Sequence, residues 1–224
     1  TTTTSGTLSL AAVNDAPEIT GTAAAVTFTE VAGPDTGANA KVVNSSLVLS
    51  DVDNSTMASA TVTISNVKTG DVLALPSNSK FTATYTAGTG VLAIAAASGQ
   101  SPTLADYQSA LRTVTFNNTS DTPDTTTRSI TFVVNDGAAN SSAYSQSVSV
   151  VATNDPPILT APSSITLTDT SAADTFANQT GTLSATDAEG TTLSFGMTGG
   201  TTGGSDVFSS VTYDIKKVGT YGTL

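Results

Sequence analysis

The chain of 224 residues contains no cysteine, no histidine and no tryptophan. The absence of Cys and His excludes thiol nucleophiles, Ser-His-Asp triads, imidazole bases and the usual zinc sites. It also excludes disulfide bonds, so the fold must be stabilised by burial of a core or by bound ions. Carboxylates, hydroxyl groups and a few basic side chains are the groups that remain for chemistry.

Basic residues are scarce, because seven Lys and Arg stand against 18 Asp and Glu, with a formal net charge of −11. Binding of phosphate groups depends on Lys and Arg, so the charge argues against nucleic acids and anionic membrane surfaces as partners. No apolar run approaches the roughly 18 residues that a membrane span requires, and we expect no membrane insertion. Divalent cations are the natural counter-ions of such a chain.

Aromatic side chains are also few, with five Tyr and seven Phe. A glycosidase could be built from two carboxylates, but it needs a cleft with aromatic platforms for the sugar. We therefore expect that the protein is not an enzyme.

An Asn-Asp-x-Pro motif occurs at residues 14–17 and again at 154–157. The two copies are 140 residues apart, which is the length of one β-rich domain, and recurrence at that distance indicates a tandem array. Each copy is followed by two acidic residues with one residue between them. These pairs are Asp51 with Asp53 and Asp187 with Glu189.

On an extended backbone the two acids of such a pair point to the same side, because side chains alternate. Hard oxygen ligands in this arrangement favour Ca²⁺, although Asp is also common in ordinary turns. An EF-hand is excluded, because Thr56 and Val62 occupy the positions where Gly and Glu are required.

Alternation of apolar and polar residues predicts strands at 26–29, 60–65, 81–85, 90–94, 114–116 and 128–134. The spacing of Leu104, Tyr107 and Leu111 predicts one short helix near 103–112. About seven short strands with frequent turns indicate an all-β fold of tandem immunoglobulin-like or cadherin-like β-sandwiches joined end to end. The predicted core includes Phe28, Ile64, Leu111, Phe116 and Phe132.

Three parts are expected along the chain, which we interpret as a piece of a larger protein. Residues 1–13 are interpreted as the last strand of a preceding module, with the strand itself at 7–13. Residues 14–155 form one cadherin-like β-sandwich, and residues 156–224 form an incomplete second one. Strands in the last part are expected at 164–167, 181–185, 192–195 and 211–214.

In a seven-stranded sandwich the chain enters at one pole and leaves at the other. The loop with Asp51 and Asp53 is therefore expected to face the first motif, whereas Glu30 and Asp121 are expected to face the second. A solvated loop charge is an open alternative for Glu30, Asp121 and Asp136, and a capped turn before Pro is one for Asn14-Asp15 and Asn154-Asp155. The candidate metal ligands are Asn14, Asp15, Glu30, Asp51, Asp53, Asp121, Asp136, Asn154, Asp155, Asp187 and Glu189.

Residues 17–155 resemble the cadherin-like tandem repeats of giant bacterial surface adhesins, which are often secreted by type I systems and carry RTX tails. The segments that carry this resemblance are 47–53, 58–64, 107–116 and 130–137. Residues 156–224 resemble the VCBS-type repeats of the same proteins, in segments 185–190 and 219–224. They end before the VCBS-type pattern does.

The resemblance implies a structural extender module, rigidified by Ca²⁺, in a large extracellular adhesin or biofilm protein at the bacterial cell surface. Its partners would be neighbouring repeats of the same protein, together with surface polysaccharide or a host protein. Two other functions remain open: a module that binds a carbohydrate or host protein, and a fibre subunit. In the fibre, residues 7–13 would complete a neighbour's sandwich by strand exchange.

Overall fold

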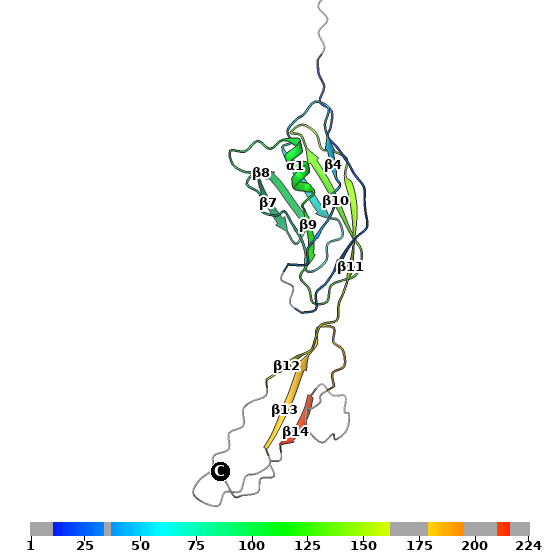
Figure 1. The fold of residues 1–224 in the computed structure, drawn as a ribbon, viewed down its shortest axis with the longest axis vertical. Coiled ribbons are helices and arrows are strands. Elements are labelled where there is room, and N and C mark those ends of the chain that lie inside the picture. Colours follow the sequence, from blue (N-terminus) through cyan, green and yellow to red (C-terminus); the bar gives the residue numbers. More distant parts are fainter. Residues whose placement is uncertain (1–10, 34–36, 162–178, 195–209, 216–224) are drawn as a thin grey trace, which may run out of the picture. The chain divides into compact units, whose positions relative to one another are not determined.

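The computed structural model describes residues 11–33, 37–161, 179–194 and 210–215 (Figure 1). The chain divides into two compact units, Thr1–Thr153 and Asn154–Leu224. The boundary directly precedes the second Asn-Asp-x-Pro motif. Within the described residues both units are built from β-strands, and the first also contains one helix. None of the described helices is long and apolar enough to cross a bilayer.

The first unit contains two sheets and one further strand pair, with eleven strands in its described part rather than the predicted seven or so. The larger sheet consists, in spatial order, of β2 (Val26–Thr29), β11 (Tyr144–Val151), β10 (Arg128–Asn135), β5 (Ser59–Ile64), β8 (Val91–Ala96) and β7 (Phe81–Thr86). The smaller sheet consists of β3 (Lys41–Val42), β9 (Thr115–Asn118) and β6 (Asp71–Ala74). The separate pair consists of β1 (Glu18–Thr20) and β4 (Val48–Ser50). Five strands are not predicted from the sequence. Strands β1, β3, β4 and β6 have two to four residues each, too few for alternation to identify them. Strand β11 has eight residues, but the buried polar Gln146 interrupts its apolar pattern.

The two sheets pack against each other in a β-sandwich-like arrangement. Alternate residues of β5, β10 and β11 are buried, which is the period of a strand with one face on the core. Phe28 of β2 meets Phe116 of β9 edge to face, with ring centroids 5.6 Å apart, so that side chains of both sheets share one core. The five core residues predicted from the sequence are at most 1% exposed.

Helix α1 (Leu104–Leu111) lies where the sequence predicts it. The Thr103 hydroxyl accepts a hydrogen bond from the Asp106 N–H at 3.2 Å, and the Asp106 carboxylate accepts one from the Thr103 N–H at 2.9 Å. This reciprocal capping box satisfies two amide groups that a helix start leaves without partners. The Tyr107 ring packs on Phe81 at 4.7 Å and its hydroxyl donates to the Ala58 carbonyl, which attaches the helix to the larger sheet.

We predict that Asp106 contributes to the acid sensitivity of the fold. Hydrogen bonds from Lys80, the Thr103 N–H and the Thr103 hydroxyl lower the pKa of Asp106 to about 2 from 3.8. A lowered folded-state pKa means that the stabilisation is complete above the unfolded-state pKa near 3.8 and is lost as the pH falls through 2. Melting temperatures between pH 6 and pH 2 should therefore fall less steeply for Asp106→Asn and Lys80→Met than for the wild type. Parallel curves for all three proteins would contradict this prediction.

Strands β7 and β8 form a hairpin, and the glycine that its turn requires is Gly90. Gly90 adopts a φ of +69°, and a Cβ there would lie 2.8 Å from the Ile64 carbonyl oxygen. Any other residue would be strained by the backbone conformation and would clash with the neighbouring strand β5.

The second unit contains one antiparallel sheet in its described part, formed by β12 (Ile158–Thr160), β13 (Gln179–Thr186) and β14 (Ser210–Ile215). The predicted strands at 181–185 and 211–214 are confirmed by β13 and β14. The prediction of a strand at 192–195 is wrong at Thr192 and Leu193. These two residues follow the turn after β13 and lie in no strand. Residues 164–167 lie outside the described residues, as do residues 7–10. Residues 11–13 do not form the predicted strand.

Candidate metal centre

The sheet topology of the first unit brings three distant segments to one end. Strands β2 and β11 pair in parallel, with Val26 opposite Val148 and Thr29 opposite Val151, so the chain leaves both strands at the same end. Strand β10 is antiparallel to β11 and begins with Arg128 opposite Val148. The loop that precedes β10, residues 119–127, therefore lies at that same end of the sheet.

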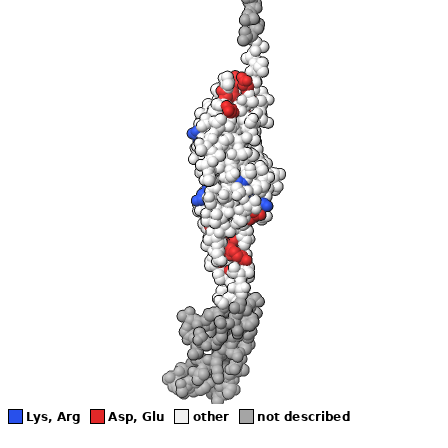
Figure 2. Space-filling view, turned by 90° about the vertical axis from the view of Figure 1, so that its right-hand side faces the viewer, with Lys and Arg blue, Asp and Glu red and all other residues white. Residues whose placement is uncertain are grey.

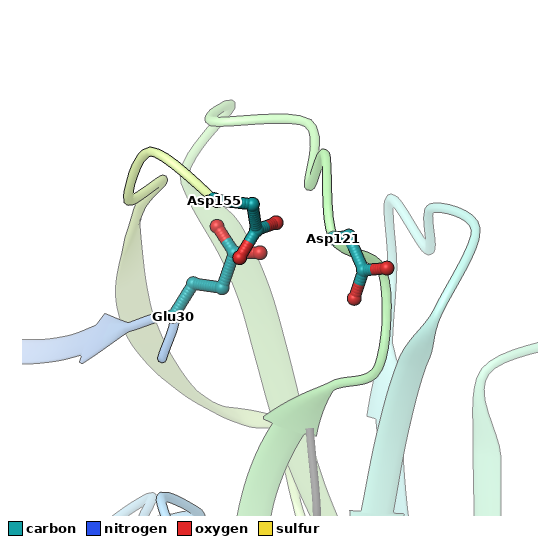
Figure 3. A group of neighbouring side chains, drawn as sticks. All are labelled: Glu30, Asp121 and Asp155. Atoms are coloured by element: carbon teal, nitrogen blue, oxygen red, sulfur yellow. The ribbon is translucent and has the colours of Figure 1, made fainter. Parts of the chain in front are cut away.

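Each of the three segments supplies one carboxylate to a common group. Glu30 follows β2, Asp121 lies in the β9–β10 loop, and Asp155 follows β11 (Figure 3). One ligand oxygen from each residue lies within 4.8 Å of the others. Glu30 and Asp155 are 4% and 5% exposed, whereas Asp121 is exposed. Among the residues that the structure describes, this is the one group of three carboxylates with such spacing.

Backbone hydrogen bonds fix Glu30 next to the chain that leaves β11. The Glu30 N–H donates to the Val151 carbonyl at 2.9 Å and extends the β2–β11 ladder by one residue. The Thr153 N–H donates to Glu30 Oε2 at 2.9 Å, and the Thr153 hydroxyl donates to the Glu30 carbonyl at 2.8 Å. The carboxylate of Glu30 is therefore held by the segment that leads directly to Asp155.

The two Asn-Asp-x-Pro motifs share two equivalent hydrogen bonds. In the first, the Asn14 amide donates to the Asp15 carbonyl at 3.0 Å, and the Asp15 N–H donates to Asp53 Oδ2 at 3.2 Å.

In the second motif, the Asn154 amide donates to the Asp155 carbonyl at 2.9 Å, and the Asp155 N–H donates to Glu189 Oε2 at 3.3 Å. In both units the second acid of the acidic pair thus accepts the N–H of the motif's Asp. The structure therefore brings each acidic pair to the motif that precedes it in the sequence.

The acidic pairs do not lie on extended backbone, and the expectation that they do is wrong. Asp51 Oδ1 accepts the N–H groups of Asp53 and Asn54 at 3.0 and 2.7 Å, and Asp187 Oδ1 accepts the Thr191 N–H at 3.1 Å. An Asp side chain that binds amides two to four residues further on stabilises a turn. Turns therefore replace the predicted extended geometry at both pairs.

At the end of the first unit where the motif Asn14-Asp15 lies, acidic side chains gather on the surface (Figure 2). The Asn14 amide donates to Asp136 Oδ2 at 2.9 Å, and the Asn54 amide donates to Asn14 Oδ1 at 3.0 Å. The Ala139 N–H, the Asn14 amide and the Ala138 N–H together lower the pKa of Asp136. Asp15, Asp51, Asp53 and Asp136 form no group with the spacing of the Glu30 cluster within the described part of the chain.

Sequence reasoning missed three residues that organise these ends, namely Asn54, Thr153 and Arg128. Asn54 and Thr153 carry no pattern that separates them from other polar loop residues. Arg128 does carry one, because it is in phase with Ile130, Phe132 and Val134 along β10, and that phase predicts a buried side chain. In the structure Arg128 is fully buried.

No family model, curated protein or solved structure matches this chain. The candidate centre is therefore defined by its geometry alone. Three segments each contribute one carboxylate, and two of these residues, Glu30 and Asp155, are buried.

Proposed function

We propose that the protein is a structural module that binds Ca²⁺ through Glu30, Asp121 and Asp155. The observation that supports this most directly is the gathering of three carboxylates within 4.8 Å at one end of a sandwich. Ionised carboxylates at such distances repel one another, and a divalent cation converts that repulsion into attraction. The ion would thereby stabilise an arrangement of three segments that the chain brings together only when folded.

The ligand chemistry favours Ca²⁺ over other common metal ions. With no His or Cys in the chain, the nitrogen and sulfur ligands that typically hold zinc and copper are absent. Carboxylates contributed by three separate segments suit an ion that accepts six to eight oxygens in flexible geometry. Mg²⁺ requires near-ideal octahedral geometry and retains several waters, so we propose weaker binding of Mg²⁺.

A Ca²⁺ ion held in this way would fix the segment that follows Thr153, because Asp155 lies two residues beyond it. The two hydrogen bonds that both Asn-Asp-x-Pro motifs share support a tandem design in which each module repeats this arrangement. Together with the resemblance to cadherin-like and VCBS-type repeats, this supports an extender module of a large extracellular adhesin at a bacterial surface. Neighbouring repeats would then be its principal partners.

Calorimetric titration with Ca²⁺ tests the site through two variants that lose the same charge. Glu30→Gln removes a buried ligand, whereas Glu18→Gln removes an exposed carboxylate of β1 that does not belong to the group. We expect Glu30→Gln to weaken Ca²⁺ binding at least tenfold and Glu18→Gln to leave it unchanged. If both variants bind like the wild type, the ion lies elsewhere, and if the wild type shows no heat of binding, the proposed function is wrong.

A further inference from the structure

We propose that the buried ion pair of Arg128 and Asp71 positions the loop 119–127, and with it Asp121, for cation binding. The inference rests on the proposed function of the Glu30 cluster. Neither Arg128 nor Asp71 belongs to that cluster, so both are positioning residues rather than ligands.

Arg128 holds the end of the loop that leads into β10. Both side chains of the pair are 0% exposed, and Arg128 Nε donates to Asp71 Oδ2 at 2.7 Å. The other two guanidinium nitrogens point into the loop, where Nη2 donates to the Asp124 carbonyl at 2.9 Å and Nη1 donates to the Thr126 carbonyl. The planar fork of Arg thus fixes two loop carbonyls while its third nitrogen is held by the carboxylate.

Asp71 holds the opposite end of the same loop through Asn118, the last residue of β9. The Asn118 amide nitrogen donates to Asp71 Oδ1 at 2.8 Å, and Asn118 Oδ1 accepts the Ser120 N–H at 2.9 Å. Ser120 directly precedes Asp121 in the sequence. One buried network therefore reaches the loop on both sides of the proposed ligand.

Gly70 shows how closely this part of the loop is packed. The Gly70 carbonyl accepts the Thr119 N–H at 2.9 Å. Its φ is +84°, and a Cβ would lie 2.7 Å from Asn118 Oδ1 and 3.0 Å from the Ser120 nitrogen. The backbone before Asp121 therefore rests directly on the turn that precedes Asp71.

A buried ion pair contributes little net stability, because removing both charges from water costs as much as their attraction returns. Burying Arg128 and Asp71 therefore calls for another physical role, and the contacts of the pair indicate that this role is to order the loop. A loop that is already ordered presents Asp121 without the entropy loss that a flexible loop would suffer when the cation binds.

The test compares Ca²⁺ affinity and loop dynamics in variants of the full chain. The double variant Asp71→Asn with Arg128→Met removes both charges, so the net charge that attracts the cation is unchanged. The matched control is Asp106→Asn with Lys80→Met, which removes the other ion pair of 2.7 Å, the one at the start of α1. Arg128→Lys is the third variant, since Lys keeps the charge beside Asp71 but lacks the fork that binds two carbonyls.

We expect the double variant and Arg128→Lys to bind Ca²⁺ about ten- to a hundredfold more weakly, as typical for loss of a residue that orients a metal ligand. Without Ca²⁺, hydrogen exchange of residues 119–127 should be faster in both, whereas the control should match the wild type in both measurements. If Arg128→Lys binds like the wild type, charge alone suffices and the positioning role is wrong. If the wild type binds and the double variant binds equally well, the inference fails while the proposed function stands. Absence of binding by the wild type would overturn both.

Discussion

Saturating Ca²⁺ is expected to raise the melting temperature of the first unit by roughly 5–10 °C. A ligand at about a hundred times its dissociation constant adds about 2.7 kcal/mol to a protein that binds it only when folded. For a unit of this size, each kcal/mol corresponds to about 2–4 °C. Residues 30, 121 and 155 are far apart in the sequence, so the unfolded chain cannot gather them and the full effect should appear. Differential scanning calorimetry with Ca²⁺ and with a chelator provides the measurement.

The same experiment with Glu30→Gln should show two opposite changes. Without Ca²⁺ the variant should melt at a higher temperature than the wild type, because one of three mutually repelling charges is gone. With Ca²⁺ the stabilisation should largely disappear, because a ligand is missing. Glu18→Gln should behave like the wild type under both conditions. Equal melting curves of the wild type with Ca²⁺ and with chelator would reject the metal centre.

The sequence predicts β5, β10 and the helix of the first unit because their patterns are long enough to carry a period. Strand β10 contains the alternating run Ile130-Thr131-Phe132, and burial alternates along all eight of its residues. Helix α1 is preceded by a capping residue and has apolar residues at helical spacing. The short strands β1 and β3 have three and two residues and form through pairing with distant partners. Local patterns cannot anticipate such strands, because tertiary contacts alone select them.

The candidate centre was predictable in part, because its members lie at segment ends that the topology brings together. Glu30 and Asp121 were expected to face the second motif, and they lie with Asp155 in one group. The extended geometry of the acidic pairs was not correct, since Asp51 uses its own carboxylate to close a turn. The parallel pairing of β2 with β11, which aligns Glu30 with the chain that leaves β11, has no local signature in the sequence.

Arg128→Met alone is expected to have the largest effect on stability, at about 3–5 kcal/mol of lost folding free energy. It leaves the Asp71 carboxylate in a site where its side chain is 0% exposed, without the guanidinium that compensates its charge. Water cannot replace that partner without opening the loop. The loss corresponds to a fall in melting temperature of roughly 6–20 °C.

The double variant Asp71→Asn with Arg128→Met should recover most of that loss, because no charge then remains buried. The Asn oxygen can still accept the Lys68 N–H, which lies 2.8 Å from Asp71 Oδ2 in the wild type. A double-mutant cycle from denaturant unfolding at 25 °C measures this coupling, and it should amount to at least about 2 kcal/mol. Additive losses in the two single variants would show that Arg128 stabilises the fold through its contacts with the loop carbonyls and not through Asp71. A stability close to that of the wild type in the double variant, combined with weakened Ca²⁺ binding, would show that the ion pair orders the loop at little benefit to the fold itself.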